Sequence, residues 1–438
     1  MTGPAGPRGT PFRLMLAATL LGFGGYALLL PVVPLWAARG GAGAFEAGAT
    51  TGVLMLLTVG TQLTVPWLIA RSGYRVVLAA GMVLLGAPAP LHALSADLGP
   101  VLAVSAVRGI GFGLLTVAGS ALVAELVAPA AHGRAAARYG LAVGVPQLGL
   151  LPAGVAVVEV LGFPAVFAAA GIAPLLGALL VPAIRVPASE RPDRVARLGV
   201  PDPRTRTAGS PDSRPDRPRV APGPTATRAR TDRDPHRKRP RPTGRLPGAG
   251  GPVLAMLGCS VAQGGLITFL PLVGAPAAVA LALFGTAAGA LVGRLLAGEL
   301  VDRRGLGGRL LPPATLLTAA GMGVEVLGVG TGAGWVLVAG AVVVGIGFGI
   351  VQNDALTALF VAGGPAHYGA ASAAWNIAYD AGTGLGAVGL GAVAGPFGFA
   401  AAFAVSGFAL LVVAPLVTLG RRPGSGASPR RRAGAGRR

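Results

Sequence analysis

Long apolar runs separated by short polar stretches recur along the whole chain. Each run has about the 20 residues that a helix needs to cross the hydrocarbon core of a membrane. The first six runs cover 14–36, 47–70, 76–95, 100–127, 136–160 and 163–183. Six more cover 252–274, 276–300, 310–330, 334–361, 368–394 and 397–419. The pattern predicts an all-α membrane protein with twelve transmembrane helices.

The composition supports this prediction. Of the 438 residues 53% are hydrophobic and only 12% are charged, and the mean hydropathy is +0.68. A soluble chain of this length would carry far more charge on its surface. Cys259 has no second cysteine to pair with, and His92, His132, His236 and His367 lack the spacing of metal ligands. We therefore expect no enzyme activity, no metal and no cofactor.

The basic residues lie mainly between and after the apolar runs. Lys and Arg number 36 against 16 Asp and Glu, and most of this excess falls in 184–251 and 420–438. The first of these segments is rich in Pro and Arg and too poor in apolar residues to fold, so we expect a disordered linker. Basic loops are retained in the cytoplasm, which predicts a multi-pass protein of the inner (plasma) membrane with both termini cytoplasmic. The linker could attract anionic lipids, whereas nucleic-acid binding is not expected.

The two sets of six runs resemble each other. GGYALLLP at 24–31 matches GGLITFLP at 264–271, and GIGFG occurs at both 109–113 and 345–349. Several matches in the same order indicate a duplicated unit. We expect two pseudo-symmetric six-helix bundles, 12–183 and 252–419, joined by the linker 184–251 and followed by the basic tail 420–438. Such halves suit a transporter whose site lies between them and that works by alternating access.

The loop after the eighth run carries the most specific motif. GELVDRRG, from Gly298 to Gly305, resembles the loop signature of the major facilitator superfamily, and the resemblance covers both six-helix units. It implies a gating role for this loop. The first-half copy, PWLIARSGYR, has Pro66 and Ala70 where the family has glycine and aspartate. The gating residues implied by the resemblance are Gly298, Glu299, Asp302, Arg303 and Gly305, with Arg71, Gly73 and Arg75 in the first half.

A second motif lies in the fourth run. VRGIGFG, with Arg108, is similar to the family's motif of an intramembrane arginine followed by spaced glycines. The resemblance associates Arg108 with proton coupling. The family's antiporter motif in the fifth helix would contain a Gly-Pro pair, which GLAVGVPQLGLLPAG lacks, so the direction of transport does not follow from it.

Asp380 lies near the middle of the eleventh run, where an ionised side chain is costly unless it faces a cavity or a partner. Asn376 and Asp380 share one helical face at i and i+4, and Trp375 and Tyr379 form a parallel aromatic pair. This stripe suits the wall of a cavity for an amphipathic solute, and Asp380 could change its protonation with conformation. A buried Asp380 that only hydrogen-bonds neighbouring helices is the alternative.

Other polar residues in the runs are candidates for the same cavity. Asp354 is a second candidate for proton coupling. Arg294 and Glu299 are expected to serve as structural gate residues, and Glu159 and Glu325 to be solvated at outer helix ends. The candidate cavity residues are Tyr26, Gln147, Gln263, Gln352, Asn353, Trp375, Asn376 and Tyr379.

These observations favour a secondary transporter that exports a small organic compound in exchange for protons, functioning as a monomer. Its partners would be the small-molecule substrate, protons and the lipid bilayer. A proton symporter or facilitator for nutrient uptake is the alternative within transport. A membrane scaffold or sensor acting through the basic linker is the alternative from another class, and deletion of 192–241 would distinguish it from a carrier.

Overall fold

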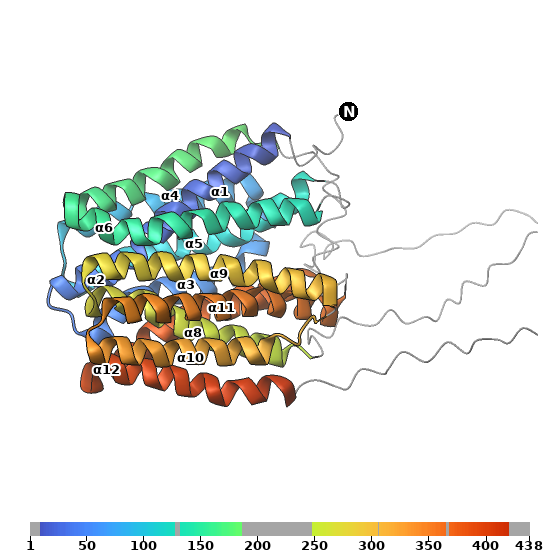
Figure 1. Cartoon of the computed structure of the whole chain (residues 1–438). Helices are drawn as coiled ribbons and strands as arrows, with labels where there is room; N and C mark the ends of the chain where they lie inside the picture. Colours follow the sequence, from blue (N-terminus) through green and yellow to red (C-terminus); the bar gives the residue numbers. More distant parts are fainter. Residues whose placement is uncertain (1–8, 128–131, 186–247, 305, 365–367, 420–438) are drawn as a thin grey trace, which may run out of the picture. The chain divides into compact units, whose positions relative to one another are not determined.

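The computed structural model describes residues 9–127, 132–185, 248–304, 306–364 and 368–419. These residues form helices and connecting turns, with no strand among them (Figure 1). The first group comprises α1 (Thr10–Leu29), α2 (Val32–Arg39), α3 (Ala44–Ser72), α4 (Tyr74–Gly86), η1 (Ala89–Leu94), α5 (Leu98–Leu126), α6 (His132–Leu180) and η3 (Val181–Ala183). The second comprises α8 (Gly250–Val273), α9 (Pro276–Arg304), α10 (Leu311–Thr331), α11 (Gly334–Gly363) and α12 (Tyr368–Leu419).

Ten helical stretches within the described residues are long and apolar enough to cross a membrane. Two of them, in α6 and α12, have 46 and 50 residues, about twice the length that one crossing requires. Each is interrupted by a glycine with positive φ, Gly162 at 77° and Gly398 at 82°. Reading each as two spans gives the twelve predicted from the sequence. The breaks fall within three residues of the predicted boundaries at 160–163 and 394–397.

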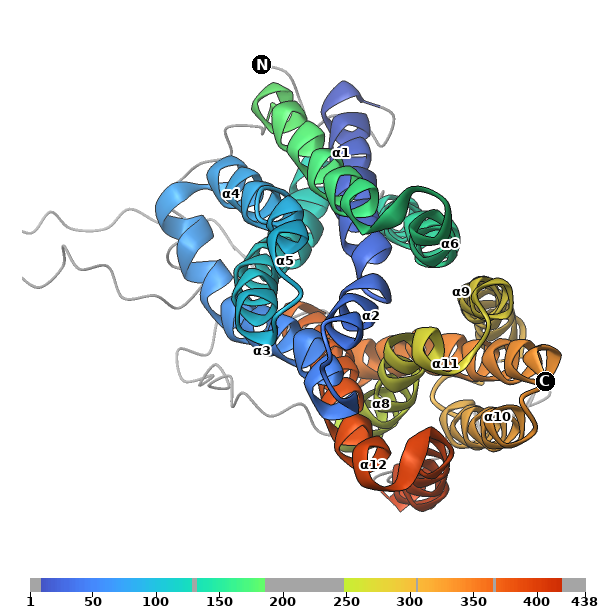
Figure 2. The same cartoon turned by 90° about the vertical axis from the view of Figure 1, so that its left-hand side faces the viewer.

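The two groups of helices, coloured blue to green and yellow to red, lie next to each other in one compact unit (Figure 1). Viewed along the helices, they meet where α3 lies beside α12 and α6 beside α9 (Figure 2). The predicted linker and tail lie, apart from their edges, outside the described residues. The fold class predicted from the sequence, an all-α membrane protein, is confirmed.

The repeated GIGFG sequences make equivalent contacts in the two groups. An added Cβ at Gly109 or Gly113 of α5 would collide with the backbone of Leu54 or Thr58 on α3. An added Cβ at Gly345 or Gly349 of α11 would collide with the backbone of Thr286 or Ala290 on α9. Thr286 and Ala290 on α9 follow Leu54 and Thr58 on α3 by the same number of residues that separates DRRGLG from ARSGYR. Glycine therefore sets the close approach of one helix pair in each half, as small residues do in membrane helices.

We predict that Gly349→Ala destabilises the protein whereas Gly323→Ala does not. The new methyl group at Gly349 would meet backbone atoms of Ala290, which have no room to move. Overpacking of this kind costs about 1–3 kcal/mol. Gly323 on α10 faces open space, so it is the matched control for the change in helix propensity. The melting temperature of each purified variant in detergent measures the difference, and equal melting temperatures would contradict the assigned packing.

Candidate functional site

The contact between α3 and α12 brings the two halves of the chain together. An added Cβ at Gly48 would collide with the backbone of Ala387, and one at Gly391 would lie 2.7 Å from the carbonyl oxygen of Ala44. An added Cβ at Gly384 would lie 2.8 Å from Cβ of Met55. The helices run antiparallel, because positions later in α3 meet positions earlier in α12. Their close approach leaves little space at this end of the contact.

Asp380 lies one turn of α12 beyond this tight contact. Its Oδ2 accepts a hydrogen bond of 2.6 Å from Nε2 of Gln62 on α3. The same amide nitrogen lies 3.2 Å from Oγ1 of Thr116 on α5. Asp380 is 2% exposed and Gln62 is 6% exposed. A buried carboxylate of one half is thus hydrogen-bonded to a buried amide of the other.

Gln62 was not among the residues predicted from the sequence, although the internal repeat points to it. The alignment of ARSGYR, starting at Ala70, with DRRGLG, starting at Asp302, makes Gln62 equivalent to Arg294. Both side chains lie on the helix of their half that faces the other half. An uncharged amide in an apolar run attracts less attention than a charge, and its partner lies 318 positions away in sequence.

Arg294 of α9 belongs to a polar and aromatic cluster. Its Nε donates a hydrogen bond of 2.5 Å to Oε1 of Gln352, which is buried on α11. Trp375 donates a hydrogen bond from Nε1 to the carbonyl oxygen of Gln352 at 3.0 Å. Tyr379 stacks on Trp375 and on Phe348, with ring centroids 5.9 Å apart in both pairs. Arg294 therefore makes its hydrogen bond inside the second half, and the gate role expected for it stays a prediction.

Tyr26 is a buried aromatic residue of the first half. It stacks on Phe112 with the ring centroids 3.9 Å apart, and its hydroxyl is buried without a hydrogen-bond partner in the described residues. It lies within electrostatic range of Tyr379, Asp380 and Arg108. Arg108 itself, 1% exposed on α5, donates hydrogen bonds to the carbonyl oxygens of Leu85 and Gly25 and does not pair with Asp380.

Asp354 is held differently from Asp380. Its Oδ1 accepts a hydrogen bond of 2.5 Å from the backbone N–H of Gly308, and its Oδ2 accepts one of 2.9 Å from that of Leu310. Leu310 immediately precedes α10, whose first N–H groups have no partner within the helix. Asp354 thus fixes the turn from α9 to α10 onto α11. This geometry is that of a structural anchor.

The remaining cavity candidates make local contacts. Gln263 exchanges hydrogen bonds with Oγ1 of Thr286 at 3.0 and 3.1 Å, which links α8 to α9. Gln147 and Asn376 donate to carbonyl oxygens one turn earlier in their own helices, at 3.4 and 2.9 Å. Asn353 is half-buried beside Asp354. The structure therefore brings together Tyr26, Gln352, Trp375, Tyr379 and Asp380 more closely than it does the other predicted residues.

The predicted gating residues lie at exposed helix ends. Glu299 and Arg303 form an ion pair of 2.6 Å within α9, with side chains 56% and 78% exposed. In the first half, Arg75 donates hydrogen bonds to the carbonyl oxygens of Ile184 and Pro182, and Gly73, with φ of 80°, separates α3 from α4. Arg71 lies 5.8 Å from the ring of Trp67. Gly298 and Asp302 lie in the last turns of α9, and Gly305 lies outside the described residues.

Two glutamates differ in their surroundings. Glu159 is exposed and lies 3.8 Å from Arg39, in keeping with the expected solvation. Glu325 was expected to be solvated too, but this was wrong: its side chain is fully buried against Gly340 of α11, and neither oxygen has a hydrogen-bond partner in the described residues. α11 covers the face of α10 that carries Glu325, and the position of Glu325 near a helix end does not reveal this.

Among the described residues, no group of three His, Cys, Asp or Glu could hold a metal ion.

Two related helical halves with polar side chains at their contact are the architecture of many transporters. The family model of the Major Facilitator Superfamily matches residues 15–387, and the chain belongs to this superfamily of transporters. No curated protein matches its sequence.

Several solved structures share the fold. A bacterial homolog of the human lysosomal transporter Spinster, inward-facing and occupied, is 15% identical, with a TM-score of 0.68 over 94% of this chain and 97% of that one. A peptide transporter POT in complex with sulfate is 14% identical, with a TM-score of 0.70 over 95% and 96%. A POT family transporter in complex with 5-aminolevulinic acid is 14% identical, with a TM-score of 0.69 over 95% and 98%. At this identity the likeness shows the fold alone.

We predict that Asp354→Ala lowers stability. The substitution leaves the N–H groups of Gly308 and Leu310 without their carboxylate, and each lost partner costs about 1–3 kcal/mol where water cannot replace it. Asn353→Ala changes the neighbouring residue and is the control for stability. Thermal unfolding of the purified variants measures the effect. If Asp354→Ala has the same melting temperature as the wild type but abolishes proton coupling, the anchor role is wrong.

Proposed function

We propose that this transporter couples the movement of a small organic compound to protons, with Asp380 as the carboxylate that binds the proton. The observation that carries the proposal is the hydrogen bond between Asp380 of one half and Gln62 of the other. A group that links the halves and changes charge on protonation can make their relative movement depend on the proton. Alternating access requires such a link to form in one state and to weaken in another.

Asp380 is favoured over the other buried acids by its position. The three fully buried acidic side chains in the described residues are Glu325, Asp354 and Asp380. Asp354 is engaged by two backbone N–H groups, and Glu325 packs between α10 and α11 of the same half. Asp380 contacts the opposite half through Gln62.

Protonation changes what Asp380 can offer to Gln62. An ionised carboxylate accepts a charge-assisted hydrogen bond, which is roughly twice as strong as a neutral one. A protonated carboxyl group instead carries an O–H donor. Oε1 of Gln62 is buried and has no partner in the described residues, so it is an available acceptor. The proton would thus exchange a strong contact between the halves for a weaker or differently oriented one.

The surroundings of Asp380 suit a compound with an aromatic or apolar body. Tyr379 stacks between Trp375 and Phe348, and Tyr26 stacks on Phe112 in the other half. Aromatic faces attract flat and apolar molecules with little dependence on orientation. This favours amphipathic compounds as substrates. We propose that they are exported in exchange for protons by a monomer in the inner membrane with both termini in the cytoplasm.

Uptake together with protons is the second candidate function. The buried cation Arg108 favours it, because an anion bound there and a proton bound on Asp380 would attract each other. The sign of the proton movement separates the two functions.

We predict that Gly384→Leu impairs alternation of the two access states. The leucine would push against Met55 and prevent the close approach of α3 and α12. A single cysteine introduced in place of Asn376 should then react with a membrane-impermeant thiol reagent from one side of the membrane only, because Cys259 is buried. Gly389→Leu is the control, since a Cβ at Gly389 meets open space. An unchanged labelling pattern in Gly384→Leu would contradict the role of this contact.

We predict that Asp380→Asn abolishes proton coupling. The variant keeps the shape of the side chain and an oxygen that accepts from Gln62, but it cannot take up a proton. Compounds that the wild type exports from a sensitised bacterial host would be tested on reconstituted protein with an internal pH dye and an imposed pH gradient. Wild-type flux should rise several-fold with the gradient, and Asp380→Asn flux should not.

Gln62→Leu should retain a pH response but lose most of the flux, because the link between the halves is removed while the carboxyl group remains. Wild-type flux that ignores the gradient would refute proton coupling altogether. Coupling that survives in Asp380→Asn would transfer the proton site to another residue.

A further inference from the structure

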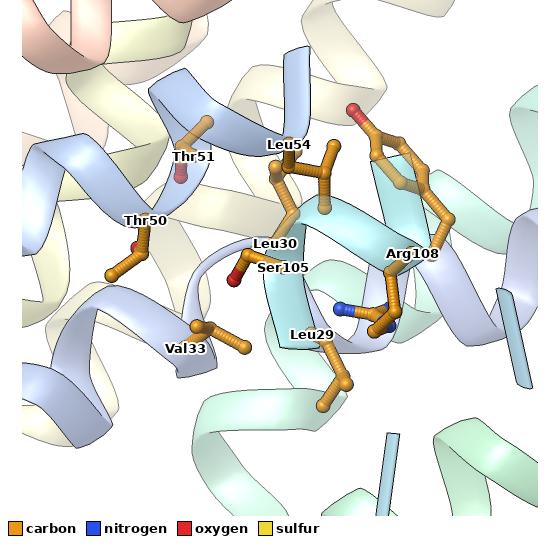
Figure 3. A pocket seen from close by; sticks show the side chains of 9 residues that line it. Leu29, Leu30, Val33, Thr50, Thr51, Leu54, Ser105 and Arg108 are labelled. Carbon is orange, nitrogen blue, oxygen red and sulfur yellow. The ribbon is translucent and has the colours of Figure 1, made fainter. Parts of the chain in front are cut away.

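A small pocket in the first half is lined by residues of α1, α2, α3 and α5, and Arg108 forms part of its wall (Figure 3). Arg108 and Ser105 are at i and i+3 on α5, so they share one helical face. The opposite walls are mainly apolar, with Leu29, Leu30 and Leu54. Arg108 lies ten residues inside α5, about 15 Å along the helix axis.

Arg108 carries a positive charge that no carboxylate neutralises in the described part of the chain. Of the five N–H donors of a guanidinium, Nε bonds to the carbonyl oxygen of Leu85 at 3.2 Å, and one Nη bonds to that of Gly25 at 3.3 Å. Carbonyl oxygens satisfy donors but do not remove a net charge. A buried arginine is normally paired with an acid or faces a polar cavity.

The polar atoms around Arg108 are also without partners in the described residues. The hydroxyl groups of Tyr26 and Ser105, which both line the pocket, are buried and make no hydrogen bond there. Both nitrogens of His92, which lies within electrostatic range of Arg108, are buried and unpaired as well. Buried polar atoms are rarely left without a partner, so several together indicate a site that another molecule completes.

The other charged groups nearby do not supply the missing anion. Asp380 is within electrostatic range of Tyr26, but its carboxylate is bonded to Gln62. Besides Arg108, the pocket residues on α1, α2, α3 and α5 are Tyr26, Ser105, Thr50, Thr51 and apolar side chains. The pocket therefore combines one fixed cation with neutral donors in an apolar wall.

We infer that this pocket binds the carboxylate of a small organic monoanion through Arg108, with Ser105 as a hydroxyl donor. A single positive charge balances a single negative one, whereas a phosphate dianion would leave a charge uncompensated among leucines. The free space is close to that of one water molecule, enough for one carboxylate oxygen, so the pocket has to widen when the rest of the polar group enters. The inference rests on the second candidate function, uptake together with protons, and adds the chemical class of the substrate.

The test measures binding at equilibrium, without any transport. The melting temperature of the purified wild type is recorded in sodium acetate, propionate and benzoate, and in the matching amides with sodium chloride at equal ionic strength. A ligand that binds the folded state raises the melting temperature in proportion to the logarithm of its concentration. At least one carboxylate should stabilise the wild type more than its amide does.

Variants then assign the effect to the pocket. Arg108→Gln should weaken carboxylate binding by about tenfold or more, and Ser105→Ala by about threefold, as expected for loss of a charged and a neutral hydrogen bond. Ser260→Ala is the matched control, because Ser260 is a buried, unpaired serine on α8, outside this pocket. Each variant is compared with its own melting temperature in chloride, so a loss of intrinsic stability does not obscure the result.

Two outcomes would overturn the inference. The first is that none of the three carboxylates stabilises the wild type beyond its amide, and the second is that Arg108→Gln keeps the full effect. The flux experiment tests the proposed function separately. Carboxylate binding without proton-coupled flux would refute the coupling but support the anion pocket. Proton-coupled flux of neutral or cationic compounds without carboxylate binding would support the coupling but refute the anion pocket.

Discussion

A polar group inside a membrane has to find its partner within the protein, because the surrounding lipid offers none. This constraint determines where the polar side chains of this chain lie. Gln62 and Asp380 form a hydrogen bond between the two halves. Arg294 and Gln352 form one within the second half, and Asp354 accepts one from the turn that precedes α10. Each pairing holds two helices in a defined position. The pairing that joins the halves is also the one whose strength changes with a proton.

Close helix packing makes these pairings possible. The hydrogen bond between Gln62 and Asp380 forms because Gly48, Gly384 and Gly391 let α3 and α12 approach until backbone atoms meet. In membranes such contact gains stability from dispersion rather than from exclusion of water. The stability of this contact therefore falls steeply when the two helices separate by a small distance. This suits an interface that has to open during each transport cycle.

The fold could be predicted well from the sequence, because the signals for membrane-spanning helices lie within short stretches of the chain. The length of each apolar run defines a span, and the repeated GIGFG sequences predicted two related halves whose equivalent glycines contact equivalent helices. The site was predicted less completely. The helical period placed Asp380 near mid-membrane beside Tyr379, but nothing local identifies Gln62 as its partner. Glu325 was misjudged for the same reason: its position near a helix end suggested solvent, but the neighbouring helix α11 buries it.

The balance of charge at the contact between the halves bears on the direction of transport. Arg108 and Asp380 both lie within electrostatic range of Tyr26, so a charge bound near one would be felt near the other. An anion at Arg108 would favour the protonated form of Asp380, and by linkage a proton on Asp380 would favour binding of the anion. Substrate and proton would then move in the same direction. A cationic compound would instead compete with the proton for the carboxylate, and the two would then move in opposite directions. If the proposed coupling holds, the charge of the substrate would therefore bear on whether it is taken up or exported.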